Sequence, residues 1–295
     1  SGFRPSINKV FLGRLSNGEP VYVAVKDLCH VALAGLTGNG KGNLMRLIMA
    51  QLCAIGVKVV MLNPHYAPFD DSGNEDWTPF IPKLETHPAD CAEYPSIAQY
   101  IKHIAVDVLR MRIERKRKGQ PVGKPYFVLI DELPAIVGKV KDAPEHIAEL
   151  LREGRKFGIY LVIASQDFQV KTIGVDGGGV RKCLKTVYYV GGDPATARAL
   201  LGEGEDGKPV QVPENDLGMG TVMLRCSAVR YPQVAQVPFV DNEALYRLVG
   251  PSTLDQLQED EPETDELSLT LEYEKSQQLK INANAKTVQA PLNSV

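Results

Sequence analysis

The stretch Gly35-Leu36-Thr37-Gly38-Asn39-Gly40-Lys41-Gly42 decides how this chain folds. It fits the phosphate-loop pattern G-x-x-x-x-G-K-[ST] at every position except the last. The apolar run His30 to Ala34 comes directly before it, and apolar residues recur at helical spacing from Asn43 to Ile55. A glycine-rich loop between a strand and a helix turns backbone N–H groups and the helix N-terminus toward phosphate oxygens. The stretch therefore predicts a nucleotide-binding site made of Gly35, Thr37, Gly38, Asn39, Gly40, Lys41, Gly42 and Asn43.

Gly42 is where the chain departs from this pattern. The hydroxyl normally found at this position binds Mg²⁺ directly, and glycine has none. Three explanations stay open: a natural or engineered loss of activity, a metal held through water, or compensation by Asn43 or Thr37. Phosphate binding survives all three, because backbone amides and Lys41 supply it. The loop therefore predicts binding of nucleotide and leaves its hydrolysis open.

The remaining apolar pattern predicts an α/β fold with a mostly parallel sheet and helices on both faces. Compact apolar runs typical of buried strands recur at 57–62, 126–130, 159–164 and 184–190. Between them, helical patterns cover 97–117 and 144–157, and a short helix follows Asp193-Pro194. Residues 64–95 are predicted to form a long loop. Two late strands, 221–225 and 233–237, are expected at one edge of the sheet.

Composition and charge divide the chain into three parts. Apolar residues make up 44% of the 295 residues and charged residues 23%, which excludes disorder over most of the length and a disulfide scaffold. The net charge of −3 hides an asymmetry: residues 1–250 carry +3 and residues 251–295 carry −6. We predict an N-terminal β-hairpin extension over 1–28, a nucleotide-binding domain over 29–250, and an acidic, polar, mobile tail over 251–295.

Polar side chains follow two of the predicted strands. Asp131-Glu132 comes directly after the strand 126–130, at the sheet edge where ligands bind in open α/β folds. There Asp131 would hold Mg²⁺ through water, and Glu132 would polarise the attacking water as general base. Gln166, after the strand 159–164, would contact the γ-phosphate or that water. The alternatives are an acidic cap for the next helix and a simple strand cap.

The chain resembles the motor domain of the FtsK/SpoIIIE–HerA family of DNA-pumping ATPases over roughly residues 8 to 240. The stretches that carry the resemblance are Phe11-Leu12-Gly13, Gly18-Glu19-Pro20-Val21, His30 to Asn43, Val128 to Leu133, Glu153 to Gln166 and Leu217-Gly218-Met219-Gly220. The resemblance implies a RecA-like core, ATP and Mg²⁺ as cofactors, duplex DNA as partner and a homo-oligomeric ring, usually a hexamer. One departure is Asn63-Pro64-His65, where many family members have Asp-Pro-Lys.

The resemblance also implies an arginine finger that each subunit supplies to its neighbour. Arg155 matches the arginine that family members carry just before a late strand, and Arg198 matches a second recurrent arginine. A guanidinium at the γ-phosphate would stabilise transition-state charge. The alternative for each is a solvated helix face or an ion pair.

A glycine-rich loop over 169–182 is the predicted DNA-binding element, through Lys171, Arg181 and Lys182. Cations that neutralise backbone phosphates give binding without sequence preference, as a translocase requires. The alternative is a surface connection. The denser basic run 110–118 is more simply explained as a solvated helix end.

These features predict an ATP-dependent duplex-DNA translocase acting in DNA segregation or transfer. Two alternatives remain: a nucleotide-binding scaffold impaired in hydrolysis by Gly42, and a coupling ATPase for conjugative or secretion transport. No apolar run approaches the length of roughly 20 residues that spans a bilayer, so a cytoplasmic location is expected. A membrane tether or a secretion partner would be reached through upstream segments or the acidic tail.

Overall fold

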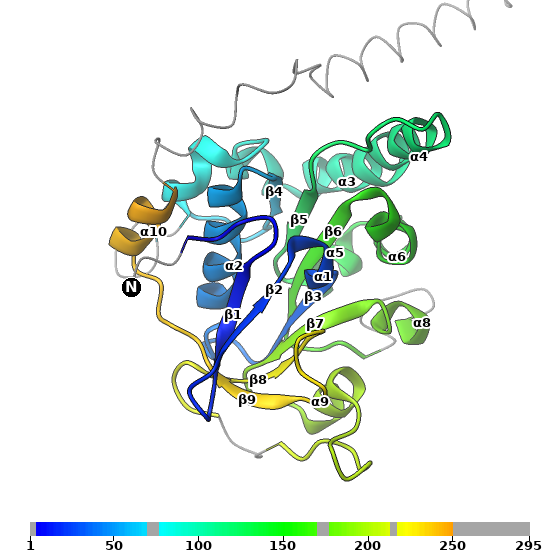
Figure 1. Ribbon diagram of the computed structural model, residues 1–295. Helices are drawn as coiled ribbons and strands as arrows, with labels where there is room; N and C mark the ends of the chain where they lie inside the picture. The colour runs from blue at the N-terminus through cyan, green and yellow to red at the C-terminus, as the bar shows by residue number, and fades with distance from the viewer. Residues whose placement is uncertain (1–3, 70–76, 170–176, 213–216, 250–295) are drawn as a thin grey trace, which may run out of the picture. The chain divides into compact units, whose positions relative to one another are not determined.

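The computed structural model describes residues 4–69, 77–169, 177–212 and 217–249, and their backbone is organised around one mixed β-sheet (Figure 1). Within these residues the sheet has nine strands in the order β2-β1-β9-β8-β7-β3-β6-β5-β4. The strands are β1 (Val10–Leu15), β2 (Pro20–Val23), β3 (His30–Ala34), β4 (Lys58–Leu62), β5 (Tyr126–Ile130), β6 (Ile159–Ser165), β7 (Leu184–Tyr189), β8 (Thr221–Arg225) and β9 (Gln233–Gln236).

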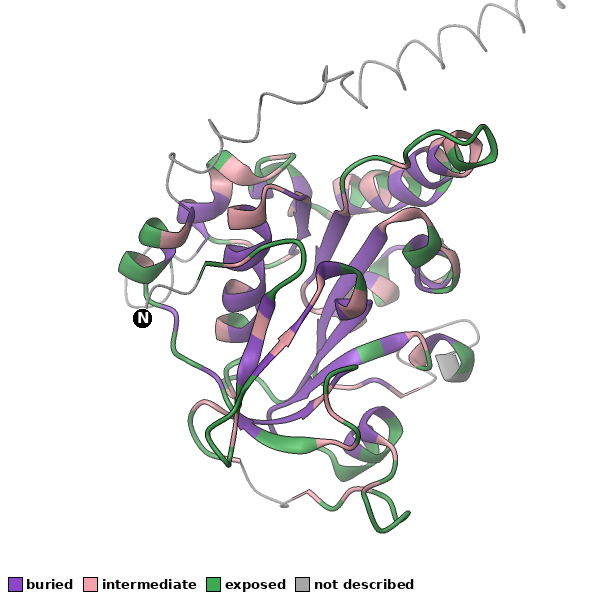
Figure 2. Cartoon of the chain, viewed as in Figure 1, coloured by how far each residue is buried: buried purple, intermediate pink, exposed green. Residues whose placement is uncertain are grey.

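The five strands from β7 to β4 are parallel and form the centre of the sheet. All residues of β3, β5 and β6 are buried, which Figure 2 shows as continuous purple strands. Strands covered on both faces need apolar side chains at every position, and this explains the unbroken apolar runs of the sequence. The α/β fold with a mostly parallel sheet is confirmed.

Helices cover both faces of the sheet. The described helices are α1 (Val25–Leu28), α2 (Lys41–Ile55), α3 (Tyr94–Lys102), α4 (Leu109–Arg117), α5 (Leu133–Lys139), α6 (Ala143–Glu153), α8 (Gly177–Arg181), α9 (Pro194–Leu201) and α10 (Asn242–Val249). A π-helix, His103–Val108, joins α3 to α4, and 3₁₀ helices span Thr78–Lys83, Pro88–Cys91 and Gly154–Phe157. In Figure 1, α2 and α10 lie on one side of the sheet, and α3, α4 and α6 lie on the other.

Alternate strand residues contribute to two separate cores. Val31 and Leu33 of β3 pack with α2 on one face, whereas Ala32 and Ala34 pack with α3, α6 and α9 on the other. This period of two is the side-chain geometry of a strand, so one short run serves both layers. The phosphate loop between β3 and α2 therefore follows one of the fully buried strands of the sheet.

Two expectations about the chain's organisation change. Strands β8 and β9 were expected at a sheet edge, but β9 pairs antiparallel with β1, so both lie inside the sheet and β2 forms the edge. The expected loop 64–95 contains the first two 3₁₀ helices, and it buries Trp77 and Phe80 in the core beside α2.

Among the described residues, every helix is too short or too polar to span a lipid bilayer. The predicted tail, 251–295, lies outside the described residues, as does Lys171.

Candidate nucleotide-binding site

The phosphate loop lies at the carboxyl ends of three neighbouring strands. The Gly35 N–H donates to the Ser165 carbonyl oxygen at the end of β6, and the Leu36 N–H donates to that of Gly191 just after β7, both at 3.2 Å. A Cβ atom on Gly35 would lie 2.3 Å from Cγ2 of Val190, so only glycine fits this close approach. Sequence and packing thus fix where the loop leaves the sheet.

Gly38 and Gly40 give the loop its shape. Their φ angles are 85° and 90°, in the left-handed region that favours glycine, and Gly40 is the N-cap of α2. The Asn39 side-chain amide donates to the Val190 carbonyl oxygen at 3.4 Å. The loop therefore curls over the N-terminus of α2, where backbone N–H groups and the helix dipole favour an anion.

Lys41 points back into the loop. Its Nζ donates to the carbonyl oxygens of Gly35 at 2.7 Å and Leu36 at 3.0 Å. Burial lowers the pKa of the Lys41 ammonium, whereas Glu132 and Asp131 oppose this effect. A buried ammonium between a loop and two carboxylates is placed to donate to phosphate oxygens.

Asp131 and Glu132 follow β5 as expected. The Asp131 N–H donates to the Leu62 carbonyl oxygen at 3.0 Å, and its Oδ1 accepts the Glu132 N–H, also at 3.0 Å. Burial, and then the charge of Glu132, raise the pKa of Asp131; that N–H bond, Lys41 and His65 oppose the rise.

Glu132 has an unusual backbone. Its φ of 52° and ψ of 57° are left-handed, a conformation that costs a non-glycine residue of order 1 kcal/mol. It is the N-cap of α5, which begins at Leu133 with a proline in its first turn. Such strain is found at sites where surrounding structure fixes a functional side chain.

Gln166 joins this group from the end of β6. It is exposed, and its Nε2 donates to the Thr37 hydroxyl oxygen of the phosphate loop at 2.8 Å. This hydrogen bond links Gln166 to the loop, and the next residue, Asp167, accepts a hydrogen bond from Thr196 of α9 at 3.3 Å.

Asn43, considered above as compensation for the missing hydroxyl at Gly42, bonds the backbone of a distant segment. Its Nδ2 donates to the Pro238 carbonyl oxygen at 2.9 Å, and its Oδ1 accepts the Val240 N–H at 2.8 Å. Because both polar atoms hold the segment after β9, Asn43 is a poor substitute for a metal-binding hydroxyl. A Cβ on Gly42 would meet nothing within 4 Å, so the missing hydroxyl is not a matter of space.

The residues present fit a Mg²⁺ ion bound together with a nucleotide. In the described part of the chain, no cluster of three or more His, Cys, Asp or Glu side chains could hold a metal alone. Mg²⁺ in nucleotide sites is commonly held by one or two carboxylates and the substrate's own phosphates. Asp131 would be the carboxylate here.

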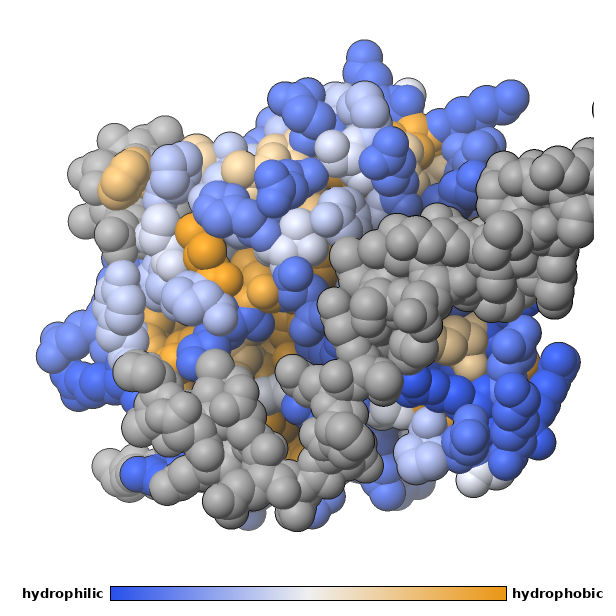
Figure 3. All heavy atoms as spheres, turned by 90° about the horizontal axis from the view of Figure 1, so that it is seen from above, coloured by the Kyte–Doolittle hydropathy of each residue, from blue (hydrophilic) through white to orange (hydrophobic). Residues whose placement is uncertain are grey.

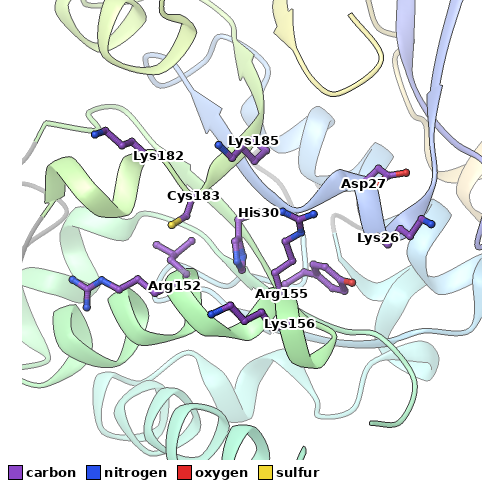
Figure 4. A pocket seen from close by; sticks show the side chains of 11 residues that line it. Lys26, Asp27, His30, Arg152, Arg155, Lys156, Lys182, Cys183 and Lys185 are labelled. Atoms are coloured by element: carbon purple, nitrogen blue, oxygen red, sulfur yellow. The ribbon is translucent and has the colours of Figure 1, made fainter. Parts of the chain in front are cut away.

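Arg155 lies elsewhere, near the amino ends of the strands. The 3₁₀ helix Gly154–Phe157 carries it, exposed, just before β6. In Figure 4 its side chain extends beside His30 toward Lys185 and Asp27. It lines a hollow of about 690 Å³, which we call the basic hollow and whose cations are Lys26, Arg152, Arg155, Lys156, Lys182 and Lys185. Arg155 therefore lies away from the phosphate loop of this chain.

Two of the three predicted DNA-binding residues line a hollow together with Arg155. Arg181 and Lys182, at the end of α8, line a second hollow that shares Arg155 and Lys185 with the first. Figure 3, viewed from above Figure 1, shows a largely hydrophilic face with apolar atoms where it is hollowed. Arg198 is separate: it is exposed on α9, and its Nε donates to the Pro194 carbonyl oxygen at 3.3 Å.

Sequence reasoning missed several residues of these sites. Lys185, Arg225 and Arg230 add to the second hollow but are scattered in the sequence. Arg112 is 0% exposed and donates to the carbonyl oxygens of Phe157, Gly158 and Lys124 at 2.9–3.2 Å, so it holds the segment that carries Arg155. It lies within the basic run that suggested a solvated helix end, and no local signal marks it.

The fold and the loop together define a P-loop nucleotide-binding domain. A family model, the central domain of the helicase HerA, matches residues 10–114. The DNA translocase FtsK of Halalkalibacterium halodurans is 23% identical over 271 residues, covering 83% of this chain and 32% of that protein. FtsK of Mesorhizobium japonicum is 25% identical over 299 residues, covering 85% and 32%. The chain thus spans about a third of the length of these relatives.

Solved structures agree on the fold. The pCW3 conjugation coupling protein TcpA, determined with ATPγS, superposes with a TM-score of 0.63 at 16% identity, covering 82% of this chain and 70% of that one. The cytoplasmic domain of the type VII secretion ATPase EccC of Thermomonospora curvata gives 0.58 at 18% identity, covering 89% and 32%. These structures show the fold alone, and the family model and the FtsK relatives support a likeness to P-loop ATPase motor domains of the FtsK/HerA type. The family resemblance of the sequence is confirmed.

Proposed function

We propose that this chain is the motor of an ATP-dependent duplex-DNA translocase that works as a homo-oligomeric ring, a hexamer, in DNA segregation or transfer. The observation that carries the proposal is the convergence of Lys41, Asp131, Glu132 and Gln166 on the carboxyl edge of three adjacent strands. The FtsK relatives, which are named DNA translocases, supply the substrate class.

Each residue has a defined part in this proposal. Lys41 and the loop amides bind the phosphates of ATP, and Asp131 holds Mg²⁺. Glu132 accepts a proton from the attacking water. Gln166 donates a hydrogen bond to Thr37 of the loop. Loss of the γ-phosphate would therefore alter the conformation at the end of β6 and in the segment that follows.

A ring explains the position of Arg155. It lies at the amino ends of the strands, and the phosphate loop lies at their carboxyl ends, so Arg155 can complete a nucleotide site only in another subunit. Arg198 on α9 is the second candidate for this contribution. Arg181 and Lys182 are proposed to contact backbone phosphates of DNA, and Lys171 is proposed with them.

The test is Mg²⁺-dependent ATP turnover with and without duplex DNA. We expect turnover that duplex DNA stimulates, and that Lys41→Ala lowers by about a hundredfold or more. Lys208→Ala, an exposed lysine far from the loop in sequence, is the matched control and should leave turnover unchanged. A wild-type rate equal to that of Lys41→Ala would refute the proposal.

Gly42 favours a second candidate, a nucleotide-binding scaffold impaired in hydrolysis. It would bind ATP with the affinity expected of a P-loop and assemble without turnover. A third candidate, a coupling ATPase for conjugation or secretion, is suggested by the names of TcpA and EccC. Competition between duplex DNA, single-stranded DNA and peptide for one binding site separates it from the first.

We place the domain in the cytoplasm, because ATP is its cofactor in every candidate function. A membrane tether or a secretion-system partner would act through segments outside the described residues.

A further inference from the structure

Two large apolar side chains are exposed on the segments next to β8 and β9. Phe239 is 82% exposed and Met219 is 101% exposed. They lie on adjacent segments, because the Val237 N–H donates to the Gly220 carbonyl oxygen at 2.8 Å. Met219 belongs to the Leu217-to-Gly220 turn that helped to define the family resemblance. Single exposed apolar residues are ordinary, so the position of these two is what needs an explanation.

The backbone around Phe239 is held against the phosphate helix. Residues 238–240, which we call the strap, are fixed on both sides of the ring by the Asn43 amide, with hydrogen bonds of 2.9 Å to Pro238 and 2.8 Å to Val240. Arg46, one turn further along α2, bonds Asn242 at the start of α10. Phe239 is therefore presented at the first turn of α2 by a rigid support.

The order of strands gives the direction in which a nucleotide must lie. The groups proposed to act on the γ-phosphate follow β5 and β6, on one side of β3. A nucleotide bound with its γ-phosphate toward these groups would extend its base toward the other side of β3, where β7, β8 and β9 lie. Met219 precedes β8 and Phe239 follows β9, so both lie on the side that the base reaches.

We propose that Phe239 and Met219 form the base-binding surface of this nucleotide site, with the base stacked on the Phe239 ring and packed against the Met219 thioether. This inference rests on the proposed binding of ATP at Lys41. Stacking on an aromatic face and contact with a flexible thioether both suit a planar heterocycle. Asn43 then acts as a positioning residue that keeps the ring at the helix.

The test compares ATP with inorganic tripolyphosphate, which carries the phosphates without the base. By titration calorimetry on the full chain, Phe239→Ala should weaken ATP binding about tenfold and leave tripolyphosphate binding unchanged. Phe239→Trp should retain ATP affinity. Tyr246→Ala, a truncation of another exposed aromatic on α10, is the matched control and should change neither.

Each other outcome has a distinct meaning. Equal losses for ATP and tripolyphosphate in Phe239→Ala would overturn the proposal, because the ring would then support the loop and not the base. Unchanged ATP binding by Phe239→Ala together with a changed sedimentation coefficient would also overturn the proposal, because the Phe239 side chain would then be a contact between subunits. Failure of wild-type protein to bind either ligand would refute the proposed function itself.

Discussion

Gly42 is the second residue of α2 and is exposed. A Cβ atom added to it would have no heavy atom within 4 Å. Its neighbours have other duties: Lys41 bonds the loop carbonyls, and Asn43 holds the strap. At the scale of single residues, the proposed site therefore has the loop and lysine for phosphate but lacks the hydroxyl that the P-loop pattern places at position 42.

Replacing Gly42 isolates that ligand. Gly42→Ala and Gly42→Ser both remove a glycine from a helix and should raise the free energy of unfolding by up to about 1 kcal/mol. Only serine adds a hydroxyl, so Mg²⁺-dependent turnover should rise about tenfold in Gly42→Ser over Gly42→Ala. Steady-state ATPase assays at several Mg²⁺ concentrations measure this. Equal rates for the two variants would show that the hydroxyl is not the missing element.

Replacing the Asp131 carboxylate should stabilise the folded protein and lower its turnover. Because burial raises its pKa in the folded state, the folded protein binds more protons than the unfolded chain, and stability falls as pH rises through that window. At neutral pH, Asp131→Asn should therefore raise the melting temperature of the nucleotide-free protein while lowering Mg²⁺-dependent turnover at least about tenfold. Thermal melts from pH 4 to 8 should show the wild-type and variant curves converging toward low pH. A variant that melts lower at pH 7 would contradict the burial argument.

At the scale of elements, the local sequence predicted the bounds of several strands and the start of a helix. The bounds of β3, β5 and β8 agree with the predicted runs. The short helix predicted after Asp193-Pro194 is α9, and the Asp193 carboxylate caps it by accepting the Ala195 and Thr196 N–H groups at 3.0 and 3.1 Å.

Long-range pairing set the rest, and the sequence carries little sign of it. The place of β9 beside β1 joins residues more than 200 positions apart, such as Arg14 and Gln236. The hydrogen bonds between Asn43 and the strap join residues 195 and 197 positions apart. In the site, the loop and the acidic pair were predictable from motifs, whereas the bond between Gln166 and Thr37 and the gathering of cations around Arg155 depend on the folded chain.

Arg112 is the residue that joins two elements near Arg155. Its guanidinium is buried and bonds three backbone carbonyls, so Arg112→Met should lower the free energy of unfolding by about 2–4 kcal/mol. Arg110→Met, two residues away on the exposed face, loses a solvent-exposed ion pair with Glu114 and should cost less than about 1 kcal/mol. Urea denaturation followed by circular dichroism checks both, and similar losses would argue against a special role for Arg112.

At the scale of the whole molecule, the two ends of the parallel strands carry different chemistry. The phosphate loop and the carboxylates lie at the carboxyl ends, and the basic hollow lies near the amino ends. A ring that places one subunit's basic edge against the next subunit's loop would use both. Residues 1–250 carry a net charge of +3, and six of their cations line the basic hollow.

Mixing of inactive subunits tests this arrangement. Lys41→Ala subunits retain Arg155, and Arg155→Ala subunits retain the phosphate loop, so an equal mixture should regain about a quarter of the wild-type ATPase rate. A mixture of Lys41→Ala with Glu132→Gln is the control. Each of these variants is defective in its own phosphate site, so mixing them produces no intact site. Recovery that is no greater in the first mixture than in the control would place Arg155 outside the active site.

The most direct measurement of the central claim is ATP-dependent movement on duplex DNA. A labelled third strand bound in the major groove of a long duplex reports passage of the motor by its release. The account predicts release that requires ATP and Mg²⁺ and is lost in Glu132→Gln. Hydrolysis of ATP without release of the third strand, or equal release in the absence of ATP, would contradict it.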